Sequence, residues 1–294
     1  MSCWYAVRYR VLGGDPDLLD ARLADVFAEG WQLEESAGGE RWIVVHVEAR
    51  DESAARDSAG RFVSAFPTGL LAPACIEIVD ERVWTQNWRG HFPPLRAGRL
   101  LVVPPWHDLT AKERACKVVR INPAMAFGTG HHASTAACLR MLDRLLQPGD
   151  FVADVGTGSG ILSIAALVLG ASRVTATDVD PIAVNAAREN AVLNQVDDRL
   201  DLQTRSGPPQ PPPGVAGYPI VVANIFAETL IAMRDALTSC VIRGGHLLLA
   251  GIGSDRLPLV QNGFRSPTWT PVLELRDDPW VALALRRETD RKTT

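Results

Sequence analysis

The sequence contains no apolar stretch long enough to cross a membrane as a helix. Its longest apolar run, near residues 161–169, falls well short of the roughly 18 to 20 residues that span a bilayer, and the first residues carry no apolar signal segment. With 294 residues and 47% hydrophobic content, the chain can bury the cores of two domains. We therefore expect a folded cytoplasmic protein with no membrane partner.

Cysteine and histidine are scarce and poorly spaced for disulfides or metal ligands. The five cysteines lie far apart, and no CxxC pair occurs. The six histidines form no HxH or HExxH motif, and the adjacent His131 and His132 would point to different faces of a helix or strand. We expect reduced cysteines and no metal site.

The front of the chain also lacks an excess of positive charge. Residues 1–110 hold 11 arginines against 16 acidic residues, a balance of −5, whereas the remainder balances at +1. An acidic surface argues against a DNA or RNA partner and suits a basic protein partner. We expect a basic protein substrate and no direct nucleic-acid binding.

The hydrophobic pattern of the first 80 residues alternates between strand and helix periodicity. Strand patterns cover residues 4–11, 42–47 and 75–79, and helix patterns cover 16–29 and 53–66. This order predicts a small α+β sandwich over residues 1–81. Proline and tryptophan are frequent in residues 82–120, which we interpret as a linker that contains one short apolar strand within 98–106.

The rest of the chain carries unbroken apolar runs, which are typical of strands buried on both faces. The runs cover residues 151–155, 174–177, 220–223 and 246–252, helix patterns lie between them at 161–169, 181–194 and 227–241, and two more strand patterns follow at 272–275 and 281–285. This alternation predicts an α/β fold with a doubly wound, mostly parallel sheet, a Rossmann-like domain, over residues 121–294. We interpret the proline-rich segment 206–214 as a stiff surface spacer.

The most informative segment is a glycine-rich turn after the first of these strands. Val152-Ala-Asp154-Val-Gly156-Thr-Gly158-Ser-Gly160 runs from a strand into a helix, and a ligand can approach such a backbone closely. Its glycines fall at relative positions 1, 3 and 5, whereas a dinucleotide fingerprint requires 1, 3 and 6, and no GK[ST] follows as in a P-loop. The adjacent Asp154 would repel a pyrophosphate and favours a positively charged ligand.

A second carboxylate, Asp178, ends the next predicted strand, 22 residues after Gly156. A carboxylate at this place reaches the hydroxyl groups of a ribose. Asp180 stands before Pro181, and we interpret it as the cap of the next helix. The complete pattern resembles that of class I S-adenosylmethionine-dependent methyltransferases, which implies S-adenosylmethionine as the cofactor.

Two further segments sharpen this resemblance. Asn122-Pro-Ala-Met-Ala-Phe127-Gly-Thr-Gly130-His-His-Ala-Ser-Thr135 precedes a helix pattern over 136–146, and Val221-Val-Ala-Asn224-Ile-Phe226 ends a buried strand. With the tryptophans of the linker, these blocks resemble the ribosomal protein L11 methyltransferase family over nearly the whole chain. The resemblance implies that the first domain recognises the basic ribosomal protein L11 and that the second methylates its lysine side chains and N-terminal amine.

We expect cofactor-binding residues in three parts of the second domain, and of these the resemblance implies, by position, Thr135, Gly156, Asp178 and Asn224. The full set is Phe127, Gly128, Thr129, Gly130 and Thr135; Asp154, Gly156, Gly158, Gly160 and Asp178; and Asn224. Asn224 is also the expected catalytic residue, because its side-chain oxygen can accept an amine hydrogen and direct the lone pair at the methyl group. The chain departs from the family at Pro219 and in the proline-rich segment, where relatives often have acidic residues near the adenine.

Each motif also has a plain structural interpretation. Residues 127–130 would then form only a turn, with Ser134 or Thr135 as the helix cap, and Asn224 would be a satisfied polar residue at a strand end. Two functional alternatives remain open at this point. One is a methyltransferase for another protein lysine or a small amine, and the other is a cofactor-binding relative without catalysis.

Overall fold

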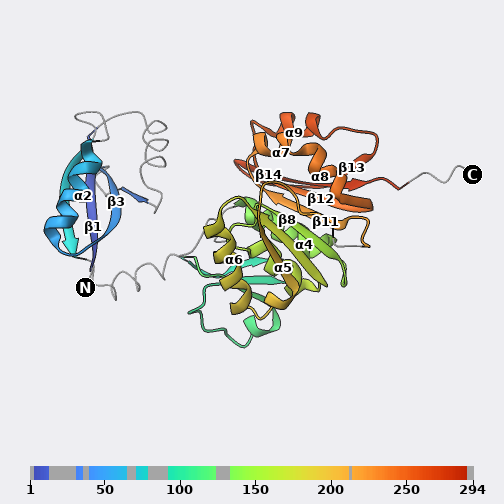
Figure 1. The fold of residues 1–294 in the computed structure, drawn as a ribbon, viewed down its shortest axis with the longest axis horizontal. Coiled ribbons are helices and arrows are strands. Elements are labelled where there is room, and N and C mark those ends of the chain that lie inside the picture. The colour runs from blue at the N-terminus through green and yellow to red at the C-terminus, as the bar shows by residue number, and fades with distance from the viewer. Residues whose placement is uncertain are drawn as a thin grey trace, which may run out of the picture. The chain divides into compact units, whose positions relative to one another are not determined.

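The computed structural model describes residues 3–12, 31–35, 40–64, 71–78, 92–123, 133–211 and 214–289. The chain divides into two compact units, Met1–His91 and Phe92–Thr294 (Figure 1). The described helices include none that is both long and apolar enough to span a membrane.

The first unit contains a four-stranded antiparallel sheet in the order β2-β3-β1-β4. Its elements are β1 (Cys3–Val11), β2 (Trp31–Glu35), β3 (Arg41–Ala49), α2 (Glu52–Ser64) and β4 (Leu71–Ile78). Tyr5, Val7 and Tyr9 alternate along β1 and are buried, as the strand period requires. The predicted small α+β unit is therefore present, and the predicted helix over 16–29 lies outside the described residues.

The second unit is built on a seven-stranded sheet in the order β10-β9-β8-β11-β12-β14-β13. The strands from β10 to β12 in this order are parallel, and β14 and β13 pair antiparallel at the far edge. The bounds are β8 (Phe151–Val155), β9 (Arg173–Asp178), β10 (Leu200–Thr204), β11 (Tyr218–Asn224), β12 (Val241–Gly253), β13 (Trp269–Asp277) and β14 (Trp280–Arg287). This arrangement confirms the predicted α/β fold class.

Helices cover both faces of this sheet (Figure 1). They are α4 (Ala133–Leu145), α5 (Ile161–Leu169) and α6 (Pro181–Leu193) for one face, and α7 (Ala227–Ala232), α8 (Arg234–Cys240) and α9 (Leu257–Gly263) for the other, with a short 3-10 turn at Asp197–Arg199. Successive residues of β11 belong to different cores, Val222 to the one with α4 and α5 and Val221 to the one with α7 to α9. This double burial explains the unbroken apolar runs.

Two sequence interpretations of the connecting segments need correction. Residues 92–120 are not a linker, because β5 (Leu95–Ala97), β6 (Leu100–Val103) and β7 (Lys117–Arg120) form a small sheet of the second unit, with a 3-10 turn at Glu113–Ala115. Leu100 and Val119 are fully buried in the same core as α4. The predicted helix over 227–241 is also wrong as a single element, since it breaks at Met233 between α7 and α8.

The proline-rich segment is packed onto the domain and is not a free spacer. Pro208 and Pro209 are buried. The Thr177 hydroxyl donates a hydrogen bond to Gly207 O at 2.9 Å, and the Tyr218 hydroxyl donates to Gln210 O at 2.9 Å. These bonds hold the segment against the carboxyl end of β9 and the start of β11.

Candidate active site

The glycine turn joins β8 to α5 through a backbone conformation that favours glycine. Gly156, Gly158 and Gly160 have φ angles of 75°, 53° and 80°. A Cβ atom added at Gly156 would lie 2.5 Å from Ile225 Cγ2, and one added at Gly160 would lie 2.9 Å from Ala187 Cβ. All three glycines are therefore required by backbone conformation, and two of them also by lack of space.

The end of β9 holds the turn through its backbone and through Asp178. Gly156 N donates to Thr177 O at 2.8 Å, and Gly158 N donates to Asp178 Oδ2 at 2.9 Å. The other carboxylate oxygen, Asp178 Oδ1, accepts from Asp180 N at 3.0 Å. The Asp178 side chain is half-buried, and its oxygens retain lone pairs for hydroxyl donors of a ligand.

Asp180 acts as the helix cap that the sequence predicted. Its Oδ1 accepts from Ile182 N at 2.8 Å, and Pro181 occupies the first position of α6. The two neighbouring carboxylates therefore differ, because Asp180 caps a helix while Asp178 binds the glycine turn.

Asp154 lies beneath the turn and is completely buried. Its Oδ2 accepts hydrogen bonds from Ser163 Oγ at 2.6 Å and Thr157 Oγ1 at 2.8 Å, while its Oδ1 has no partner among the described residues. Burial raises the pKa of Asp154 to about 6, against the lowering effect of the two hydroxyls. The group is therefore mostly ionised at neutral pH and places negative charge next to the turn, which fits a cationic ligand and not a phosphate.

Asn224 ends β11 and reaches the first turn of α4. Its Nδ2 donates to Thr135 Oγ1 at 3.1 Å, and Thr135 is only 2% exposed. Gly251 of β12, with a φ of 78°, makes room for this strand end, since a Cβ there would lie 2.6 Å from Ile225 O and 3.2 Å from Asn224 Oδ1. The sequence analysis missed Gly251. Its only signal in the sequence is that a glycine interrupts the apolar run from Leu247 to Ile252.

The strand register brings three predicted residues to one edge of the sheet. Val155 of β8 pairs with Thr177 of β9 and with Ala223 of β11. The next residue along each strand is respectively Gly156, Asp178 and Asn224. They stand in line at the carboxyl ends of three adjacent parallel strands, which is where such sheets bind ligands.

Some predicted residues fall outside the part of the chain that the structure describes. They are the expected cofactor contacts Phe127, Gly128, Thr129 and Gly130. The pair His131 and His132, at which we expect no metal, also lies outside. Within the described ranges, no three His, Cys, Asp or Glu side chains gather as metal ligands would.

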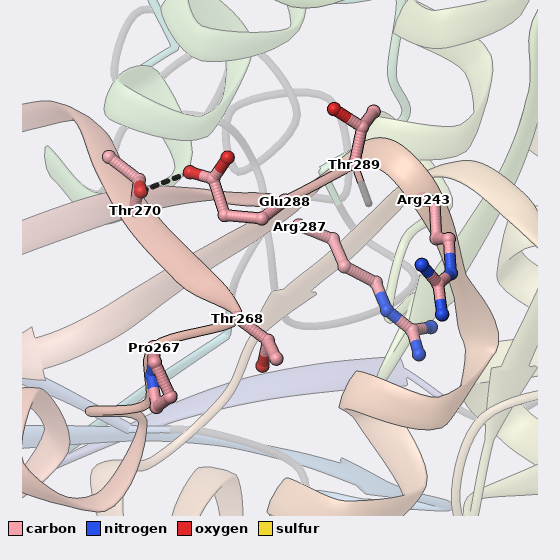
Figure 2. A pocket seen from close by; sticks show the side chains of 7 residues that line it. All are labelled: Arg243, Pro267, Thr268, Thr270, Arg287, Glu288 and Thr289. Carbon is pink, nitrogen blue, oxygen red and sulfur yellow. Dashed lines mark hydrogen bonds between the residues drawn. The ribbon is translucent and has the colours of Figure 1, made fainter. Parts of the chain in front are cut away.

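A cavity of about 420 Å³ opens at the opposite end of the sheet (Figure 2). It is lined by Arg243, Pro267, Thr268, Thr270, Arg287, Glu288 and Thr289. Arg287 donates to Val241 O at the start of β12, and Glu288 accepts from Thr270. These two charged side chains are therefore already hydrogen-bonded within the domain. None of the described site residues lines it, and we do not place the predicted ligand there.

Comparisons with known proteins agree with the resemblance in the sequence. Residues 23–288 match the family model described as Ribosomal protein L11 methyltransferase (PrmA). The ribosomal protein L11 methyltransferase of Geobacter sulfurreducens is 37% identical over 302 residues, covering 97% of this chain and 98% of that protein. That of Symbiobacterium thermophilum is 43% identical over 216 residues, covering 73% and 69%. The solved ribosomal protein L11 methylase from Lactobacillus delbrueckii subsp. bulgaricus has a TM-score of 0.61 at 32% identity, covering 67% of this chain and all of that one.

Proposed function

The chain belongs to the ribosomal protein L11 methyltransferase family, and from this we propose that it transfers methyl groups from S-adenosylmethionine to amines of ribosomal protein L11. The observation that carries the proposal is the alignment of Gly156, Asp178 and Asn224 at the ends of three adjacent strands. These residues combine an open backbone turn, a carboxylate for hydroxyl groups and an amide oxygen for an amine. The proposed acceptors are lysine side chains and the N-terminal amine.

The residues at this edge fit S-adenosylmethionine in charge and in shape. Asp178 would bind the ribose hydroxyls, and the glycine turn would admit the nucleoside because Gly156, Gly158 and Gly160 carry no side chains. Asp154, with its unpartnered Oδ1, supplies negative charge that complements a cation. When bound, the cofactor supplies a methyl group on a sulfonium centre that already activates it for transfer.

Asn224 would position the amine that accepts the methyl group. Its Nδ2 is directed to Thr135, so its Oδ1 is the acceptor that remains for a hydrogen of the attacking amine. A lysine amine, with an ordinary pKa near 10.4, must first release a proton to solvent, and a desolvated pocket beside a positive charge lowers that pKa. Positioning then provides most of the catalysis, and no dedicated base is required.

The first unit is proposed to select the substrate. Residues 1–91 hold 9 arginines against 15 acidic residues, and this balance of −6 would attract a basic ribosomal protein, with no nucleic acid needed as a partner. We assign this recognition to residues 1–81 and the methyl transfer to the second unit, Phe92–Thr294. The reaction would take place in the cytoplasm, where ribosomal proteins are synthesised.

The direct test incubates the full chain with radiolabelled S-adenosylmethionine and unmethylated ribosomal protein L11, followed by mass spectrometry of the product. We expect label on lysine side chains and on the N-terminal amine. Labelling of other proteins or small amines but not of L11 would replace the proposed substrate. Cofactor binding without turnover on any amine would overturn the proposed catalysis.

A further inference from the structure

We propose that Asn190 of α6 is a positioning residue that sets the conformation of the glycine turn for cofactor binding. The inference rests on the proposed use of this turn for S-adenosylmethionine. Asn190 is 1% exposed, and both ends of its side-chain amide are hydrogen-bonded to backbone groups of other elements. Its Nδ2 donates to Ser159 O within the turn at 2.9 Å, and its Oδ1 accepts from Asn122 N, beyond β7, at 2.9 Å.

Asn190 binds the end of the turn, whereas β9 binds its start. Thr177 and Asp178 hold the amides of Gly156 and Gly158, at the start of the turn. Asn190 holds the carbonyl of Ser159, two residues before α5 begins at Ile161. The peptide units between these two anchors include the amide of Ser159, so rotation at either anchor would change the backbone that faces the ligand.

Close packing of α6 adds to this hydrogen bond. A Cβ at Gly160 would lie 2.9 Å from Ala187 Cβ and 3.0 Å from Ala187 Cα, so α6 lies directly against the end of the turn. Asn190 is three residues after Ala187 and therefore on the same face of the helix. This face of α6 fixes both the position of Gly160 and the direction of the preceding carbonyl.

Asn194, one helical turn further along, offers a matched control. Its Oδ1 accepts from Arg120 N at 2.8 Å, and its Nδ2 donates to Arg120 O at 2.6 Å. Asn194 thus holds the end of β7 much as Asn190 holds Asn122. Its Nδ2 also donates to the backbone oxygen of Asn190 at 2.7 Å, and none of these bonds involves the glycine turn. A role in general stability predicts similar effects for both residues, whereas the positioning role predicts an effect on the cofactor for Asn190 alone.

The experiment measures the dissociation constant of S-adenosylmethionine by calorimetry, and the melting temperature, for Asn190→Leu, Asn194→Leu and Asn185→Leu in the full chain. We expect Asn190→Leu to weaken cofactor binding about tenfold or more, because the buried Ser159 carbonyl loses a hydrogen bond. Asn194→Leu should lower the melting temperature but leave the dissociation constant within about twofold. Asn185 is exposed on the same helix, and its replacement should change neither quantity.

Asn190→Asp keeps the experiment decisive if the leucine variant does not fold. Its carboxylate still accepts from Asn122 N but cannot donate to Ser159 O, so at pH 8 it should also bind S-adenosylmethionine about tenfold more weakly. Wild-type affinity in a folded Asn190 variant, or equal losses for Asn190→Leu and Asn194→Leu, would overturn the inference. Failure of the wild-type protein to bind S-adenosylmethionine would overturn the proposed function, and this inference with it.

Discussion

Asn224 and Thr135 are 89 residues apart in the sequence, yet Asn224 Nδ2 donates to Thr135 Oγ1 at 3.1 Å. The bond joins the end of the central strand β11 to the first turn of α4. Because the amide nitrogen is held by Thr135, the amide oxygen has a defined direction. We therefore propose that Thr135 orients Asn224, in addition to its proposed contact with the cofactor.

Thr135→Val tests this relationship. Valine keeps the volume but removes the hydroxyl, so Asn224 Nδ2 loses its acceptor. We expect kcat for methyl transfer to fall about tenfold, with a smaller change in cofactor affinity. Thr135→Ser retains the hydroxyl and should keep most of the activity. A valine variant with wild-type kcat would remove Thr135 from this role.

Asp178→Asn tests the proposed contact with the ribose. Loss of the charge should weaken S-adenosylmethionine binding by about 1 to 3 kcal/mol, the usual contribution of charge-assisted hydrogen bonds. Asp180→Asn is the control, since Asp180 caps α6 and Asn is also a good cap. Calorimetry should give the control wild-type affinity. An unchanged dissociation constant for a folded Asp178→Asn would contradict the assignment.

The raised pKa of Asp154 predicts how stability depends on pH. Its pKa is about 6 in the folded state against 3.8 ordinarily, so the folded state binds the proton more tightly. Protonation of Asp154 therefore adds about 3 kcal/mol to the free energy of unfolding below pH 3.8. This contribution is lost as the pH rises through about 6. Denaturation of cofactor-free protein should show Asp154→Asn gaining stability relative to wild type between pH 4 and pH 7. A difference that does not vary with pH would show that Asp154 does not titrate in this range.

Gly160→Ala tests the close packing of the turn against α6. The new methyl group would combine a positive φ with contacts of 2.9 and 3.0 Å to Ala187. Gly149→Ala is the matched control, because its φ is +93° but no atom lies within 4 Å of the added Cβ. We expect Gly149→Ala to cost about 1 kcal/mol of unfolding free energy and Gly160→Ala at least twice as much. An equal loss of unfolding free energy in the two variants would show that the turn can move away from α6 to accommodate the added methyl group.

The sequence predicted the residues at the carboxyl ends of the parallel strands better than it predicted the contacts that other elements make with them. Gly156, Asp178 and Asn224 could be found because each ends a buried apolar run, and parallel strands bring such ends together. Asn190 and Gly251 could not be found, because their contacts depend on how α6 and β12 pack in three dimensions. The linker interpretation was wrong for a related reason. The apolar run 100–103 indicates a strand, but not that this strand packs in the same core as α4.

We propose that Asn224 positions an amine at the edge where the glycine turn and Asp178 would bind the cofactor. The most direct measurement compares kcat for methylation of ribosomal protein L11 with the dissociation constant of S-adenosylmethionine in Asn224→Ala. We expect kcat to fall about 100-fold and cofactor affinity to fall about threefold or less, because orientation of the amine matters chiefly in the transition state. Equal losses in both quantities, or an unchanged kcat, would contradict the proposal.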